Sequence, residues 1–254
     1  MDSIKLQKYF TDCGIMSRRA AEKEIADGKV RVNGSPATPG MRIIPGVDSV
    51  TYMGKEIQMP KFKKSVYIML NKPRGYLTTM SDDRGRATVA ELVADVNTRV
   101  YPIGRLDMDS EGLLLLTNDG ELALKLTHPR HEIPKIYHVR VAGKVSPETL
   151  KRLNQAMDID GYRILPVKTE LISLKDDFSV LKMTLFEGRN RQIRKMCEQV
   201  ELQVLRLNRI AIGNIKLGEL APGKWRYLTS SQVEYLRTSG STSPQKSKCK
   251  LKKR

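Results

Sequence analysis

Apolar residues in the first sixty positions recur at short helical or alternating spacings, as in a small module of mixed secondary structure. The spacing predicts helices over residues 5–11 and 18–26, and Ser17 is well placed to cap the second of them. Alternation predicts strands over residues 30–32 and 49–53. An Asn-Gly pair and a further glycine follow these strands, so we expect tight turns after each.

The composition changes over residues 55–65, where one proline and four lysines stand among few apolar residues, as is typical of a linker. We therefore predict a first domain over residues 1–60, a linker over 61–65 and a second domain over 66–236. The last stretch, residues 237–254, is polar, rich in lysine and aperiodic. We predict a disordered basic tail there.

The second domain holds more strand patterns than helical ones. Apolar runs or strict alternation predict strands over residues 66–70, 113–117, 137–141, 167–173, 180–186, 204–207 and 210–216. Helical spacing and cap residues predict helices over residues 89–96, 121–126, 147–157 and 190–200, and a last short helix after Thr229. Because many neighbouring strands are hairpin-like, the expected fold class is α+β with a mixed, mostly antiparallel sheet.

The charge of the chain points to a polyanionic partner. The 254 residues include 45 lysines and arginines against 28 acidic residues, a net charge of +17. Seven of the basic residues lie in the tail, so the rest of the chain still carries +10. An excess of this kind favours nucleic acid as the partner, and a basic surface with solvated lysines is the alternative.

Several classes of protein do not fit the sequence. No apolar stretch approaches the roughly 18 residues of a membrane span, and the N-terminus lacks the apolar core of a secretory signal. Cys13, Cys197 and Cys249 are too few and too scattered for a disulfide framework, and the three histidines have no thiol near them in sequence. We therefore expect no metal site, no membrane association and a cytoplasmic location.

The helix predicted over residues 190–200 has two distinct faces. Its apolar face follows i, i+3, i+4, i+7 spacing and contains Ile193, Met196, Cys197 and Val200. Its opposite face carries the cations Arg191, Arg194 and Lys195, and Arg189 stands in the turn before it. These cations suit phosphate binding, and a solvated basic face is the alternative.

Two further segments carry candidate chemistry. Asp107, Asp109 and Glu111 fall within five residues just before a predicted buried strand, a common place for a catalytic carboxylate. A surface turn is the alternative there. Lys135 and Tyr137 are two residues apart on a strand and therefore share a face, where a cation beside a ring can hold a splayed base. A half-buried structural tyrosine is the alternative.

These segments resemble a known family. Residues 6–34 (LQKYFTDCGIMSRRAAEKEIADGKVRVNG) resemble the S4 RNA-binding domain. Three blocks resemble, in the right order, the motifs of RsuA-type pseudouridine synthases: GRLDMDSEGLLLLTNDG at 104–120, KIYHVRV at 135–141 and FEGRNRQIRKMCE at 186–198. The similarity covers about residues 4–236. It implies a small S4 domain followed by a two-lobed α+β catalytic domain.

The resemblance also implies an activity, the isomerisation of uridine to pseudouridine in folded RNA without a cofactor or a metal. Asp107 matches the family's catalytic aspartate, which acts in its ionised form as nucleophile or base. Arg194 matches the basic residue that pairs with that aspartate, and Tyr137 matches the tyrosine that packs on the target base. We interpret Asp109 and Glu111 as loop residues rather than catalysts.

The implied partner is ribosomal RNA or a ribosomal subunit precursor, bound by a monomer. In the catalytic domain the candidate RNA contacts are Arg105, Lys135, Arg189, Arg191 and Lys195. In the S4 segment they are Lys5, Lys8, Arg18, Arg19, Lys23, Lys29 and Arg31. The length of the S4 segment and the sequence LLLLTNDGELALKLTHP favour the large-subunit branch of the family over the small-subunit branch.

Three other functions are compatible with parts of the pattern. A non-catalytic S4-type assembly factor would bind ribosomal RNA only, but it would not require Asp107, Tyr137 and Arg194 together. A glycoside hydrolase would use two carboxylates, but it would leave the basic excess unexplained. A DNA-binding regulator would need a recognition-helix pattern, which the sequence lacks.

Overall fold

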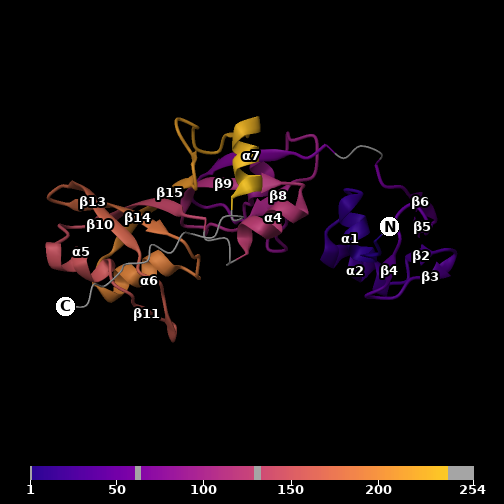
Figure 1. The fold of residues 1–254 in the computed structure, drawn as a ribbon, viewed down its shortest axis with the longest axis horizontal. Helices are drawn as coiled ribbons and strands as arrows, with labels where there is room; N and C mark the ends of the chain where they lie inside the picture. Colours follow the sequence, from indigo (N-terminus) through magenta and orange to yellow (C-terminus); the bar gives the residue numbers. More distant parts are fainter. Residues whose placement is uncertain (1, 61–63, 129–132, 240–254) are drawn as a thin grey trace, which may run out of the picture. The chain divides into compact units, whose positions relative to one another are not determined.

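The computed structural model describes residues 2–60, 64–128 and 133–239. Its contacts divide the chain into two compact units, Met1–Lys64 and Ser65–Arg254, whose elements are labelled in Figure 1. Residues 61–63 of the predicted linker and residues 240–254 of the predicted tail lie outside the described residues.

The first unit combines two short helices with a small antiparallel sheet. Its elements are β1 (Ile4–Lys5), α1 (Leu6–Asp12), α2 (Arg18–Ala26), β2 (Val30–Val32), β3 (Ser35–Pro36), β4 (Arg42–Ile43), β5 (Val50–Tyr52) and β6 (Lys55–Ile57). The main sheet has the order β3-β2-β5-β6, and β1 pairs with β4. The Ser17 hydroxyl caps α2 by accepting a hydrogen bond from the Ala20 amide at 3.1 Å, as the sequence predicts.

The linker pattern of residues 55–65 is wrong at its start. Residues 55–57 form β6 and pair with β5, and Ile57 is buried in the core of the unit beside Phe10 and Ile25. One apolar residue in three gives too weak an alternation for a strand to be predicted. The strand exists because Ile57 has a place in the core and its backbone has a partner strand.

The second unit is built on one large sheet. Its strands are β7 (Tyr67–Lys72), β8 (Tyr101–Ile103), β9 (Glu111–Thr117), β10 (Lys135–Ala142), β13 (Lys168–Leu174), β14 (Phe178–Leu185), β15 (Val204–Ile212), β16 (Ile215–Lys216) and β17 (Trp225–Tyr227), with a separate hairpin of β11 (Asp158–Ile159) and β12 (Tyr162–Arg163). Its helices are α3 (Val89–Leu92), α4 (Gly120–Thr127), α5 (Pro147–Leu153), α6 (Gln192–Gln199) and α7 (Ser230–Thr238). The sheet order is β13-β14-β10-β15-β9-β7-β17, and β9–β15 is its parallel pair. This confirms the predicted α+β class with a mixed, mostly antiparallel sheet.

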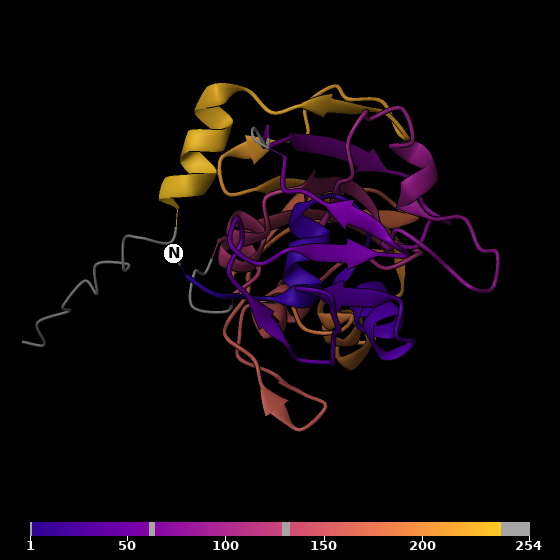
Figure 2. The ribbon, with the colours of Figure 1, turned by 90° about the vertical axis from the view of Figure 1, so that its right-hand side faces the viewer.

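The sheet falls into two lobes that meet where β15 lies beside β9. In one lobe, apolar residues of β10 and β14 pack against the predicted apolar face of α6, and Met196 and Cys197 are fully buried. In the other lobe, β7 and β9 are covered on both faces, by α4 and α7 on one side and by α3 on the other (Figures 1 and 2). A strand buried on both faces accounts for the unbroken leucine run of residues 113–116.

Several boundaries differ from the sequence prediction. The strands expected over 204–207 and 210–216 form one long strand, β15, followed by β16. The polar pair Asn208 and Arg209 interrupts the apolar pattern, yet these two residues carry the parallel pairing to Glu111 and Gly112. At the C-terminal end α7 continues to Thr238, so the first two residues of the predicted tail are helical.

Candidate active site

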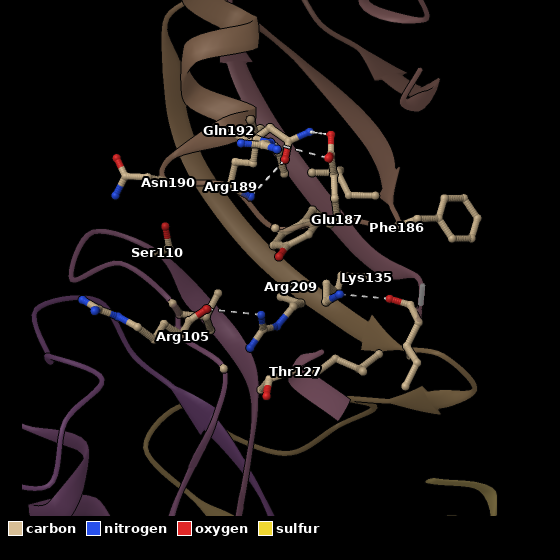
Figure 3. Close-up of a pocket in the computed structure, with 18 of the residues that line it drawn as sticks. Arg105, Ser110, Thr127, Lys135, Phe186, Glu187, Arg189, Asn190, Gln192 and Arg209 are labelled. Atoms are coloured by element: carbon tan, nitrogen blue, oxygen red, sulfur yellow. Dashed lines mark hydrogen bonds and ion pairs between the residues drawn. The ribbon is translucent and has the colours of Figure 1, made fainter. Parts of the chain in front are cut away.

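A cavity of about 790 Å³ opens in the second unit where its two lobes meet. One side consists of the β8–β9 loop, including Arg105 and Asp107. The other side consists of β10, β15 and the turn before α6 (Figure 3). Three chain segments that resemble one family's motifs therefore converge on a single hollow.

Asp107 lies in the β8–β9 loop with its side chain 36% exposed. Its carboxylate Oδ2 is 3.8 Å from Nη1 of Arg191. The main-chain carbonyl of Asp107 accepts a hydrogen bond from the Ser110 amide at 3.1 Å, which closes a tight turn. The carboxylate is thus held at the cavity by its backbone and faces a cation.

Below this loop lies Lys72, at the end of β7, which is fully buried. Its ammonium donates hydrogen bonds to the carbonyl oxygens of Pro73, Asp107 and Ser110 at 3.1, 3.0 and 2.8 Å. Burial lowers the pKa of Lys72 to about 8, although the charge of Asp107 favours the protonated form. Sequence reasoning missed this residue, and the signal was a lysine ending a strand that is otherwise buried.

The cations of the α6 region divide into three roles. Arg191, at the N-cap with φ +50°, reaches Asp107 and lies 3.2 Å from Oδ1 of Asp109. Arg194 is 15% exposed and forms its ion pair with Asp109, at 3.2 Å, while its Nη2 also donates to the Asp109 carbonyl at 3.1 Å. Lys195 turns away to Asp160 in the β11–β12 hairpin.

The expected direct pair of Arg194 with Asp107 is therefore replaced. Arg194 holds the loop through Asp109, and Arg191 is the cation at Asp107 itself. Arg191 adopts a left-handed backbone conformation at the N-cap of α6, with φ +50°. Burial lowers the pKa of Arg194, and the charge of Asp109 opposes that effect.

Tyr137 and Lys135 both line the cavity from β10, as their shared face predicts. Tyr137 is half-buried and packs against the cores of both lobes. The Lys135 ammonium donates to the carbonyl of Ile133 at 3.1 Å. Burial lowers the pKa of Lys135, and the nearby positive charge of Arg209 lowers it further.

Arg209 is a second residue that sequence reasoning missed. It is 4% exposed, lies across from Tyr137 in the β10–β15 pair, and lines the cavity. Its Nε donates to the carbonyl of Leu113 at 2.7 Å and its Nη1 to the carbonyl of Arg105 at 3.4 Å. In a chain with 45 basic residues, nothing in the sequence marks this one out.

The remaining predicted contacts of the second unit lie at the rim of the cavity. Arg105 is exposed. Arg189 stacks on Tyr162 with its guanidinium carbon 3.0 Å from the ring centroid, and its Nε lies 3.6 Å from Glu187. Both arginines remain accessible to a polyanion at the opening.

In the first unit the cations predicted to contact RNA differ in their exposure and in their ion pairs. Lys8 pairs with Asp12 at 2.6 Å, and Lys29 pairs with Glu24 at 3.0 Å. Arg31 donates to a main-chain carbonyl in its own turn. The other four are exposed, namely Lys5, Arg18, Arg19 and Lys23. All seven stay predictions as RNA contacts.

Within residues 2–60, 64–128 and 133–239, no three His, Cys, Asp or Glu side chains gather as a metal site would need. None of the helices in these ranges is both long and apolar enough to cross a membrane.

Comparison with known proteins places both units. Residues 66–199 match the RNA pseudouridylate synthase family, and residues 14–48 match the S4 domain. The chain is 42% identical over 238 residues to an RNA pseudouridine synthase of Aquifex aeolicus, which covers 93% of this chain and 94% of that protein. It is 40% identical over 235 residues to ribosomal large subunit pseudouridine synthase B of Bacillus subtilis, with 92% and 95% covered.

A solved structure agrees with the sequence matches. The crystal structure of a pseudouridylate synthase superposes with a TM-score of 0.64 at 29% identity, covering 92% of this chain and 99% of that one. The similarity thus extends over both units, and it confirms the resemblance that the three sequence blocks indicate. With its S4 domain and its two-lobed catalytic fold, the chain belongs to the RNA pseudouridylate synthase family.

Proposed function

We propose that this enzyme isomerises a specific uridine of large-subunit ribosomal RNA, with Asp107 as its catalytic carboxylate. The observation that carries the proposal is the convergence of Asp107, Tyr137 and Arg191 on one cavity. The similarity to ribosomal large subunit pseudouridine synthase B of Bacillus subtilis supports the choice of RNA. A subunit precursor in the cytoplasm is the expected form of the substrate, and the enzyme is expected to act as a monomer.

The chemistry is an isomerisation, so every atom of the uridine is retained. The bond from N1 to C1′ breaks, the base turns, and a bond from C5 to C1′ forms. The proton on C5 leaves and N1 takes up a proton. The ionised carboxylate of Asp107 serves the ribose as nucleophile or as base.

The cations around Asp107 position its carboxylate for this role. Arg191 faces its carboxylate, with Nη1 3.8 Å from Oδ2 of Asp107. Arg194 and Lys72 act indirectly, because they hold the carbonyls and the second carboxylate of the same loop. The three side chains fix where the Asp107 carboxylate lies before the RNA arrives.

Tyr137 is proposed to receive the extruded base. Flipping a uridine out of a stack costs a few kcal/mol, and packing on an aromatic ring offsets part of that cost. The half-buried ring on the cavity wall is suited to this contact. Arg105, Arg189 and Arg191 stand at the opening, where the flanking phosphates of a flipped nucleotide would pass.

The S4 unit is proposed to supply affinity and placement. The exposed cations Arg18 and Arg19 begin α2, where the helix N-terminus adds favourable donors for phosphate. Reversing both charges, as in the double variant Arg18→Glu and Arg19→Glu, is expected to weaken RNA binding and to flatten its salt dependence. An unchanged salt slope contradicts this role for the pair.

The test is release of tritium from transcripts labelled at C5 of uridine. Wild-type enzyme, Asp107→Asn and Asp109→Asn are each offered large-subunit and small-subunit ribosomal RNA, free and in subunit precursors. We expect release from large-subunit RNA by the wild type, no release by Asp107→Asn, and reduced but measurable release by Asp109→Asn. Equal release by Asp107→Asn and wild type refutes the site, and tight binding without release on every substrate favours a non-catalytic assembly factor.

A further inference from the structure

Arg209 and Lys135 form a pair of sequestered cations in the cavity. Arg209 is 4% exposed and Lys135 is half-buried. In the described part of the chain neither has a carboxylate within ion-pair distance, and their known hydrogen bonds go to main-chain carbonyls. Figure 3 shows both side chains entering the cavity from the sheet that forms its floor.

Such a pair costs stability unless something compensates it. A buried charge without an opposite charge is expensive, and Nη2 of Arg209 is shielded from solvent with no hydrogen-bond partner. The two positive charges also act on each other, since Arg209 lowers the pKa of Lys135. A site that retains this unfavourable pair is suited to a negative charge that the substrate carries or develops there.

The depth of the two cations in the cavity distinguishes between two sources of that negative charge, the RNA phosphates and the flipped base. Phosphates of the RNA backbone stay near the surface, where Arg189 and Arg191 are 41% and 43% exposed. Arg209 lies instead across from Tyr137 on the sheet, so it faces the place proposed for the flipped base. A base that packs on Tyr137 brings its polar edge toward the floor of the cavity.

We propose that Arg209, assisted by Lys135, stabilises the negative charge that the uracil gains when its bond to the ribose breaks. In that step the electron pair of the N1–C1′ bond stays with the base. The Asp107 carboxylate compensates at the ribose, either by bonding to C1′ or by taking a proton from C2′. When C5 bonds to C1′, the carboxylate leaves C1′ or returns the proton to C2′, so the negative charge passes from the base back to Asp107. The C5 proton then departs and N1 takes up a proton. This inference rests on the proposed function.

The geometry of Arg209 suits this role. Its Nε and Nη1 are anchored to the carbonyls of Leu113 and Arg105, so the guanidinium is oriented before substrate binds. Arg105 is two residues before Asp107, so one scaffold positions the carboxylate and the cation. A donor fixed in advance in a water-poor site is worth more than the same donor in water.

The test compares uridine with 5-fluorouridine at the target position of one RNA. Fluorine withdraws electrons and stabilises the uracil anion by itself, so an enzyme that lacks the stabilising cation is helped more on this substrate. Single-turnover loss of the parent nucleoside, followed by chromatography of digested RNA, measures bond cleavage in both cases. We expect Arg209→Met to slow cleavage of uridine about 10²–10³-fold. For 5-fluorouridine we expect the loss in cleavage rate to be smaller by a factor of about ten.

Controls separate this role from a structural one and from phosphate binding. Arg209→Lys keeps the charge and is expected to retain more activity than Arg209→Met, and Lys135→Met is expected to show a smaller loss with the same substrate dependence. Arg206→Met, an exposed arginine of the same strand that pairs with Glu111, is expected to slow both substrates equally or not at all.

Three results overturn the proposal. An equal loss by Arg209→Met on both substrates, together with a lower Tm, assigns Arg209 a structural role. If Arg209→Met weakens RNA affinity and reduces the salt slope but leaves the cleavage rate unchanged, Arg209 binds a phosphate of the RNA. If the wild type cleaves neither the uridine RNA nor the 5-fluorouridine RNA, the proposed function itself is refuted. That outcome is read from the wild type alone, without the variants.

Discussion

Replacing Lys72 by methionine tests how a buried lysine supports the loop that carries Asp107. Methionine fills a similar volume, removes the charge and cannot donate to the carbonyls of Pro73, Asp107 and Ser110. In the wild type the folded protein lowers the pKa of Lys72 from 10.5 to about 8. At 1.36 kcal/mol for each pKa unit, keeping this lysine protonated in the fold costs about 3 kcal/mol.

The sign of the pH effect follows from where the proton is bound. Below pH 8 Lys72 is protonated in both states and the full cost is present. Between pH 8 and 10.5 the unfolded chain binds more protons than the fold, so the stability of the wild type rises relative to Lys72→Met. Above 10.5 the difference is constant again.

Urea unfolding of both proteins from pH 7 to 10.5 measures this difference directly. We expect the free energy of unfolding of the wild type to rise by about 3 kcal/mol relative to that of Lys72→Met across that window. Groups that titrate in the same way in both proteins cancel in this difference. Lys144→Met, an exposed lysine paired with Asp176, serves as the matched control and is expected to show no comparable trend. Parallel stability curves for the wild type and Lys72→Met would refute the reasoning. In tritium release near pH 7, Lys72→Met is expected to lower the rate and leave RNA affinity intact.

Further substitutions test other parts of the fold. Gly112→Ala is expected to destabilise the catalytic domain by more than about 2 kcal/mol, because φ is +103° and a Cβ there would lie 2.2 Å from Oδ1 of Asn208; an unchanged Tm contradicts this. Ser17→Ala removes a helix cap and is expected to cost about 1 kcal/mol in urea unfolding of the S4 unit. Burial raises the pKa of the Cys197 thiol to about 12, so iodoacetamide at pH 8 is expected to leave it unmodified in the native protein, as mass spectrometry of its peptide reports.

The parts of this structure that could be predicted from sequence are those with local causes. The cap at Ser17, the apolar face of α6 and the shared face of Lys135 and Tyr137 depend on spacing within one segment, and the structure shows all three. The meeting of Asp107 with the α6 region needed the family resemblance, because more than eighty residues separate them.

What the sequence does not reveal depends on partners distant along the chain. Lys72 and Arg209 matter through the carbonyls they reach, and no pattern in their own strands encodes those contacts. The ion pairs of Arg191 with Asp107 and of Arg194 with Asp109 join α6 to a loop more than eighty residues earlier. The family resemblance pairs Arg194 with Asp107 and assigns no carboxylate to Arg191.

The pairing of β17 with β7 has a consequence for how the protein is made. Trp225 lies opposite Leu70, so one of the last strands of the catalytic domain completes the sheet that its first strand begins. During translation β7 leaves the ribosome more than 150 residues before its outer neighbour and waits with one edge unpaired. The lobe that holds Asp107 therefore reaches its final form only when synthesis of the domain is nearly complete, whereas the S4 unit, which lies wholly upstream, is free to fold first. The unit proposed to place the RNA is then folded before the unit proposed to act on it.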